Sequence, residues 1–244
     1  MKRIFITSIF VMLLASVSAQ NSSSASPTSV EQVVSLPKTD WLVSFNTVKI
    51  DGPMNVVFKK VDTAEELRIT YDTKGNITSK FKFEIDKKGV LVVSEKSDPK
   101  RTSVTDITIY YNSLREVKLA HAKAEFEDTI TSEIFDLAVS GGAMASLDIK
   151  TLDTAVECTG VSRLTIGGTT KYLTMRVSTA KVDGSKLSTV SSTIEASHSA
   201  EVRLVVSERL EATTSTGAKL LSKGYPTILR DHNAIFGGEI ININ

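Results

Sequence analysis

The sequence predicts an all-β protein in which a short right-handed parallel β-helix follows an antiparallel β meander or small sandwich. Two patterns predict this fold. Apolar and polar residues alternate at period two in several runs of residues 41–112, as they do in half-buried strands. Residues 113–244 then repeat a motif about every 18 to 20 residues, a period typical of solenoids whose coils stack on one another.

Residues 1–19 have the pattern of a secretory signal peptide. Lys2 and Arg3 precede an apolar run that ends in Ser18 and Ala19, so the charged, apolar and small-residue regions follow in the expected order. The run is shorter than the ~20 residues that span a bilayer. No cysteine near the cleavage site could carry a lipid anchor. We therefore expect an exported protein of the periplasm or cell surface, without a transmembrane segment.

Residues 20–40 are expected to form a flexible linker. They are rich in serine, contain Pro27, and hold too little apolar surface to offset the entropy cost of ordering. The alternating runs start at Trp41.

The alternating runs of residues 41–112 predict an antiparallel β region. Asp86-Lys87-Lys88-Gly89 separates two runs as a hairpin turn in which the glycine supplies a positive φ, and residues 73–76 are a second candidate turn. A solenoid end is a row of unpaired backbone groups that something must cover. We expect residues 41–112 to cap one end of the helix and residues 224–241, which break the repeat, to cap the other.

Six apolar triplets carry the repeat of residues 113–244. In each triplet one outward residue stands between two inward residues, which favours parallel β coils. At ~4.8 Å per coil, six coils would form a rod about 30 Å long. The triplets are centred on Lys118, Ala138, Glu157, Arg176, Glu195 and Thr213.

A column of hydroxyl residues follows the triplets. Stacked Ser and Thr side chains can bond to neighbouring coils or to turn backbone, and small residues allow a sharp bend. The residues after the triplets are Ala120, Ser140, Thr159, Ser178, Ser197 and Ser215, and two positions further come Ala122, Gly142, Val161, Ala180, Ser199 and Gly217.

Composition narrows the function. Lys plus Arg number 29 against 28 for Asp plus Glu, so the basic surplus that drives binding to nucleic acid is missing. Cys158 is the only cysteine, which excludes an intramolecular disulfide. We expect Cys158 to be a small buried hydrophobe.

Three sets of polar residues are candidates for a ligand, metal or catalytic site. The outward column Glu157, Arg176 and Glu195 predicts a structural charge ladder. His121 and His198 occupy equivalent corners about 19 Å apart, too far to share a metal, and with His232 they are expected to be exposed turn residues. The acidic cluster Glu125, Glu127 and Asp128 finds no acids in the next coil, where Ala145 and Leu147 lie, so we expect a solvated edge. No catalytic, cofactor or metal site is predicted.

The chain resembles a known family of exported proteins. The resemblance covers residues 41–244 and implies a β-helical fold in the envelope of Bacteroidetes, with no catalytic residues to transfer. Gly52-Pro53-Met54-Asn55 stands where a Gly-Ile-Asn-like signature would be expected. The residues Phe45-x-x-Val48, Ile50, Gly52, Asn55, Val56, Leu91-Val92-Val93 and Ile107-x-Ile109-Tyr110-Tyr111, with the repeated Ser-x-Gly/Ala corners, resemble the putative auto-transporter adhesin, head GIN domain family.

Three threonines resemble the acceptor sites that are glycosylated in exported Bacteroidetes proteins. They are Thr63, Thr129 and Thr154, each preceded by an aspartate and followed by alanine or isoleucine. The leading hypothesis is a noncatalytic binding or scaffold module for a glycan or protein partner. The alternatives are a polysaccharide lyase or glycosidase on a β-helix, for which fold analogy is a weak warrant, and an envelope component that assembles through its coil ends.

Overall fold

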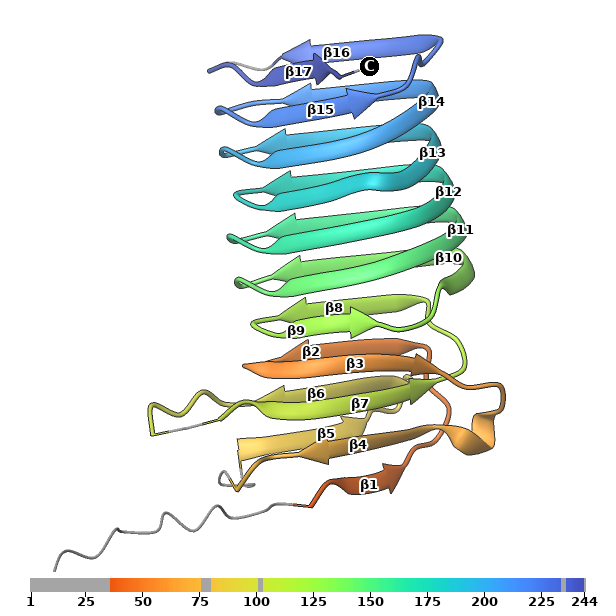
Figure 1. The fold of residues 1–244 in the computed structure, drawn as a ribbon, viewed down its shortest axis with the longest axis vertical. Helices are drawn as coiled ribbons and strands as arrows, with labels where there is room; N and C mark the ends of the chain where they lie inside the picture. Colours follow the sequence, from red (N-terminus) through yellow and green to blue (C-terminus); the bar gives the residue numbers. More distant parts are fainter. Residues whose placement is uncertain (1–35, 76–79, 101–102, 234–235, 244) are drawn as a thin grey trace, which may run out of the picture. The chain divides into compact units, whose positions relative to one another are not determined.

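A computed structural model describes residues 36–75, 80–100, 103–233 and 236–243, which all belong to one compact unit, Val33–Asn244. The all-β class is confirmed, because strands make up 68% of the described residues and build a β-solenoid of about 7 turns, close to the six coils expected (Figure 1). The described residues contain one short 3-10 turn, Ala64–Glu66, and no helix long and apolar enough to cross a membrane. The predicted signal peptide and most of the predicted linker lie outside the described residues.

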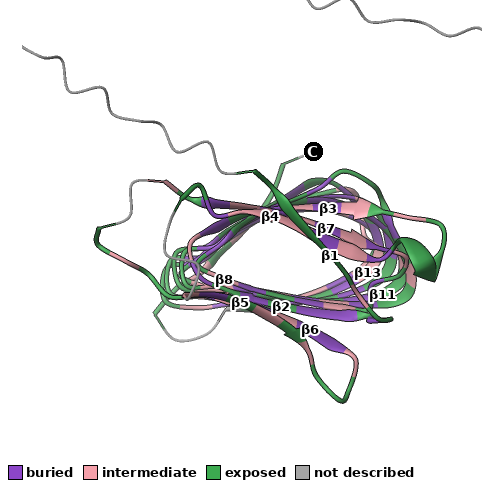
Figure 2. Cartoon of the chain, turned by 90° about the horizontal axis from the view of Figure 1, so that it is seen from below, coloured by how far each residue is buried: buried purple, intermediate pink, exposed green. Residues whose placement is uncertain are grey.

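The solenoid has two sheet faces. In spatial order, face A consists of β5 (Phe81–Ile85), β6 (Val90–Glu95), β2 (Thr47–Asp51), β8 (Glu116–Ala120), the second halves of β10 (Ile130–Ser140), β11 (Met144–Thr159), β12 (Arg163–Ser178), β13 (Lys181–Ser197) and β14 (Glu201–Thr214), and β16 (Ile228–Asn233). Face B consists of β1 (Lys38–Trp41), β4 (Arg68–Asp72), β7 (Thr105–Tyr111), β3 (Met54–Lys60), β9 (Lys123–Phe126), the first halves of β11 to β14, β15 (Lys219–Lys223) and β17 (Glu239–Asn242). The buried residues of both faces form one hydrophobic core, and Figure 2 shows that strands of both faces carry buried residues.

The predicted register of the triplets is confirmed. Ala138 pairs with Lys118 on one side and Glu157 on the other, and Arg176 pairs with Glu157 and Glu195. The residues that flank each of these are buried, because successive side chains of a strand point to opposite faces of the sheet.

The pairing of residues 41–112 differs from the antiparallel region expected. β2, β3, β6 and β7 pair parallel and are full members of the stack, with β2 between β6 and β8, and β3 between β7 and β9. Antiparallel pairing is limited to β1 with β4, β4 with β7, and β5 with β6. The alternation of apolar and polar residues cannot distinguish parallel from antiparallel pairing. It shows which side of the sheet each side chain lies on, but it does not show the direction of the neighbouring strand.

The predicted hairpin at residues 86–89 is present. The Asp86 carboxylate accepts bonds from the backbone N–H groups of Lys88 and Val90, and Gly89 has a φ of +74°. These bonds, above all the one from Val90, lower the pKa of Asp86.

Tight turns connect face A to face B, and they come in two lengths. From β8 onward, five turns place two consecutive residues at positive φ, whereas His121 and Thr179 each turn the chain alone. The small residue that points into the core after each turn therefore falls one position later in the longer turns. The column of small residues expected from the sequence therefore contains inward residues from the short turns and turn residues from the long ones. The residues that are buried after the turns are Ala122, Ala143, Ser162, Ala180, Ala200 and Ala218.

The opposite, broad edge of the coils holds buried hydroxyl groups. Thr154 bonds to Thr151 at 2.6 Å and to Thr170 at 3.1 Å, and Thr189 bonds to Ser192 at 2.7 Å. These bonds satisfy polar groups inside the bend.

The two ends of the stack are built differently. At the N-terminal end, β1 and β5 run antiparallel to their neighbours. At the C-terminal end, residues 224–241 do not break the stack as expected, because β16 and β17 add a further parallel coil. Two inward columns end in polar residues there, since Asp231 follows buried Ala212 and Asn242 follows buried Ser222. An inward charge is a known device against edge-to-edge association.

Candidate binding groove on face A

Three hollows follow one another along face A and form what we call the face A groove. The first and second share Lys118 and Ala138, and the second and third share Glu157 and Arg176. The groove therefore crosses successive coils along the solenoid axis. Its polar lining residues are Lys49, Asp51, Glu116, Lys118, Asp136, Ser140, Glu157, Thr159, Thr174, Arg176, Ser178, Glu195, Ser197, Thr213 and Ser215.

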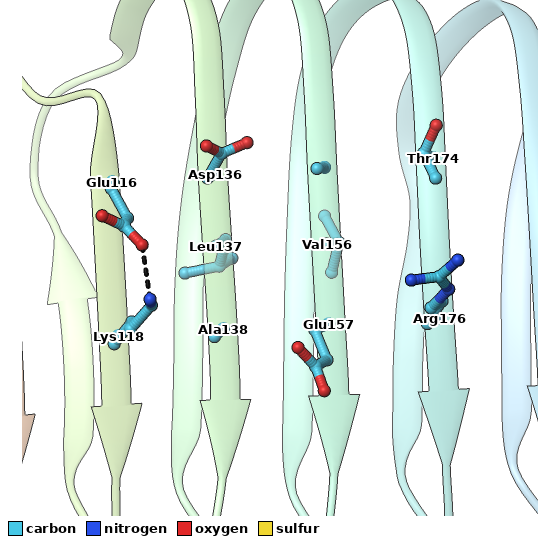
Figure 3. Close-up of a pocket in the computed structure, with 10 residues that line it drawn as sticks. Glu116, Lys118, Asp136, Leu137, Ala138, Val156, Glu157, Thr174 and Arg176 are labelled. Atoms are coloured by element: carbon cyan, nitrogen blue, oxygen red, sulfur yellow. Dashed lines mark ion pairs between the residues drawn. The ribbon is translucent and has the colours of Figure 1, made fainter.

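Two alanines create the middle hollow, which has a volume of about 250 Å³. Ala138 stands in the outward column between Lys118 and Glu157, and Ala155 lines the next coil. The longer side chains on either side leave a gap above the alanines (Figure 3).

Carboxylates from three successive coils line the middle hollow. Glu116 comes from β8, Asp136 from β10 and Glu157 from β11. Lys118 forms a 2.6 Å ion pair with Glu116 (Figure 3). This bond raises the pKa of Lys118, and the nearby charges of Asp136 and Glu157 raise it further.

The charge ladder is formed in part. Nε of Arg176 donates to Glu195 at 2.9 Å, whereas Glu157 forms no ion pair with another described residue. Glu157 is therefore free to meet a ligand.

The three histidines lie on different coils, as expected. His121 Nδ1 lies 3.0 Å from Asp51 Oδ1 at the tight edge, and His198 lies 3.2 Å from Ser178. His232 lies on β16. The described residues hold no cluster of His, Cys, Asp or Glu that could bind a metal.

The acidic cluster lies on face B and is tied to its own neighbours. Glu127 forms a 3.0 Å ion pair with Lys59, and Asp128 accepts a bond from the backbone of Lys60. Glu125 pairs with Ser146, one position from the residues expected there.

Cys158 is fully buried as predicted, and burial raises the pKa of its thiol to about 12.

The three threonines that resemble glycosylation sites differ in exposure. Thr63 and Thr129 are exposed, but Thr154 is buried with an exposed fraction of 0%. Thr154 cannot accept a glycan in the folded protein, because its hydroxyl is committed to the interior network.

A second hollow, the end cleft, lies between β1 and β4 on face B and β5 and β6 on face A. Its volume is about 560 Å³. Tyr71, Phe81 and Phe83 form its apolar wall, with ring centroids 4.9 to 6.0 Å apart. Burial and then the bond to Asp40 raise the pKa of Tyr71. The other lining residues are Lys38, Lys82, Glu84, Val92 and Ser94.

Sequence reasoning missed Glu116, Asp136 and the end cleft. The two acids stand two positions before the outward residue of their triplets, so the repeat alone could have shown them as a second outward column. The cleft depends on how β1 and β5 pair with the other strands, and the sequence repeat contains no information about that pairing.

Comparison with known proteins agrees with this architecture. A sequence model described as "Putative auto-transporter adhesin, head GIN domain" matches residues 44–226. A search of curated proteins finds no match.

Solved structures show the same fold. A putative adhesin from Bacteroides fragilis superimposes with a TM-score of 0.78 at 16% identity, covering 85% of this chain and 96% of its own. A putative adhesin from Parabacteroides merdae gives 0.66 at 14% identity, with 86% and 96% covered. A protein from Parabacteroides distasonis described as a putative lipid binding protein gives 0.63 at 14% identity, with 86% and 96% covered.

Proposed function

Because the chain belongs to the putative auto-transporter adhesin, head GIN domain family, we propose that it is a noncatalytic exported envelope protein that binds an extended partner, a glycan or a protein chain, along the face A groove. The observation that carries this proposal is the continuity of the three hollows across successive coils. A ligand that lay along the axis would meet a new set of side chains about every 4.8 Å.

The rigidity of the groove supports binding. Each coil is hydrogen-bonded to the coils on both sides, so the groove needs no ordering when a ligand arrives, and that saves free energy of association. Solenoid faces of this kind suit long ligands.

A blocking substitution tests the groove. Ala138→Arg fills the middle hollow, and Ser146→Arg places the same side chain on the exposed surface of face B as a matched control. Purified wild-type protein and both variants are applied to an array of linear polysaccharides and extracellular matrix proteins. We expect at least one probe to bind wild-type protein and S146R but not A138R. Equal binding by all three proteins, or no binding to any probe, would reject the groove.

Polysaccharide cleavage is the second candidate function. One observation favours it: Glu116, Asp136 and Glu157 line one hollow from three successive coils, and carboxylate pairs carry acid–base chemistry in glycosidases. Release of oligosaccharides from a polysaccharide panel, abolished by both Asp136→Asn and Glu157→Gln, would replace the binding role with an enzymatic one.

A further inference from the structure

We propose that the end cleft binds an acidic sugar residue, a hexuronate, at a site separate from the middle of the face A groove. The inference names a ligand class for the proposed binding role and rests on that role. Its evidence is the lining of the cleft, which combines a wall of aromatic rings with two lysines that form no ion pair with any described residue.

The aromatic wall offers one contiguous apolar surface. Phe81 is buried and forms its base, while Tyr71 and Phe83 are half-buried and present ring surface to the cleft. The rings are tilted at 37 to 57° to one another. The C–H face of a sugar ring is apolar and can pack on such a surface, as other apolar groups do.

The Tyr71 ring packs on Phe81 and Phe83, with ring centroids 4.9 and 5.6 Å apart, and this packing holds the ring in place. Tyr71 thus acts as a preset wall, which avoids an ordering cost on binding.

Charge selects among sugars. Lys38 and Lys82 line the cleft, and neither forms an ion pair with any described residue. Among the described residues that line the cleft, two lysines stand against one carboxylate, that of Glu84. A carboxylate on the ligand would supply the missing partner through a charge-assisted hydrogen bond. Glu84 and Ser94 remain to bond sugar hydroxyls.

The same lining argues against other ligand classes. A fatty acyl chain would fill the cleft without partners for two lysines and a glutamate, and burial of unpaired charges is costly. The volume of about 560 Å³ lies within the ~300–1,000 Å³ of small-ligand pockets, which suits one to a few sugar rings.

The cleft also meets the groove. Val92 lines both the end cleft and the first hollow of the groove. An acidic sugar in the cleft can therefore belong to a chain that continues along face A.

Calorimetric titration with short oligosaccharides tests the cleft. The probes are an oligogalacturonate, the matching neutral oligogalactoside, and dodecanoate as an apolar chain. The cleft variants are Phe83→Ala and the double variant Lys38→Ala/Lys82→Ala. Controls are Lys150→Ala, which removes an exposed lysine of β11, and Ala138→Arg.

We expect the oligogalacturonate to bind wild-type protein and both controls, and to bind both cleft variants about tenfold more weakly or not at all. The lysine double variant should lose the preference for the acidic over the neutral sugar. Binding that survives both cleft variants, preference for dodecanoate, or no binding of any sugar would overturn the inference. Because A138R blocks the groove and leaves the cleft open, failure of the cleft and failure of the groove are read separately.

Discussion

A Cβ atom added to Gly52 would lie 2.2 Å from the carbonyl oxygen of Glu95. Gly52 also has a φ of +134°, and its N–H donates to the carbonyl of Ala120 at 3.1 Å. The turn between β2 and β3 thus packs directly on the coil built by β6 and β7. A glycine is required here both by the backbone angle and by the lack of space.

Gly52→Ala should destabilise the protein by about 3 kcal/mol, because strain and a backbone clash add. Gly142→Ala is the matched control, since Gly142 has a φ of +80° with open space around its Cβ position, and should cost only about 1 kcal/mol. Urea unfolding at neutral pH measures both values. Equal losses for the two variants would show that the contact with Glu95 contributes nothing.

Val161→Gly should stabilise the protein by about 1 kcal/mol, because a β-branched side chain is strained in the left-handed region. Val161 has a φ of +57° and is 71% exposed, so little burial is lost. The thermal midpoint should rise by about 2–4 °C. Val161→Ala, which keeps a Cβ, should change the midpoint less, and a lower midpoint for V161G would contradict the strain.

Stability should fall at alkaline pH, in part because of Cys158. Its pKa rises from 9.0 to about 12 in the folded protein, so the unfolded chain loses this proton first, and the stabilising effect present below pH 9 is lost as pH rises toward 12. At pH 10.5 the loss from this group is about 2 kcal/mol. The free energy of unfolding should therefore drop less between pH 8 and pH 10.5 for Cys158→Ala than for wild-type protein. Parallel curves would show that the thiol does not contribute.

Glycosylation in a Bacteroidetes host stays a prediction for Thr63 and Thr129. Both are exposed, whereas buried Thr154 should remain bare. Peptide mapping by mass spectrometry of the native protein distinguishes the three sites. An intact mass equal to the mature polypeptide would remove the hypothesis, and a glycan on Thr154 would mean that modification precedes folding.

Location is a separate prediction. The proposed adhesin-like role requires cell-surface exposure, so added protease should digest the protein on intact cells while a periplasmic control protein survives. Protection until the outer envelope is opened would place the protein in the periplasm and point to a scaffold there.

The sequence was most informative where the chain repeats. In a triplet such as Val156-Glu157-Cys158, the two apolar residues are the ones that face the core, and the distance in sequence to the next triplet shows which residues pair on the neighbouring coil. The register of β10 to β14 could therefore be predicted from the pattern alone. The groove was only half visible, because the ladder of Glu157, Arg176 and Glu195 was apparent while the gap at Ala138 becomes a hollow only when its neighbours are long.

The pairing of strands that lie far apart in the chain could not be predicted from the sequence. β2 pairs with β6 and β8, which lie far along the chain, and nothing in the alternation of residues 41–112 names those partners. The end cleft depends on the same distant pairings.

Because of the position of β2 and β3 in the stack, the order in which the strands are synthesised differs from the order in which they lie along the solenoid. These strands leave the ribosome before β6 to β9, yet they lie between them. The coil formed by β2 and β3 therefore gains its first neighbour only when residue 111 has emerged, and its second only when residue 126 has emerged. Such long-range closure slows folding, and slow folding is compatible with the proposed export of the chain across a membrane before it folds.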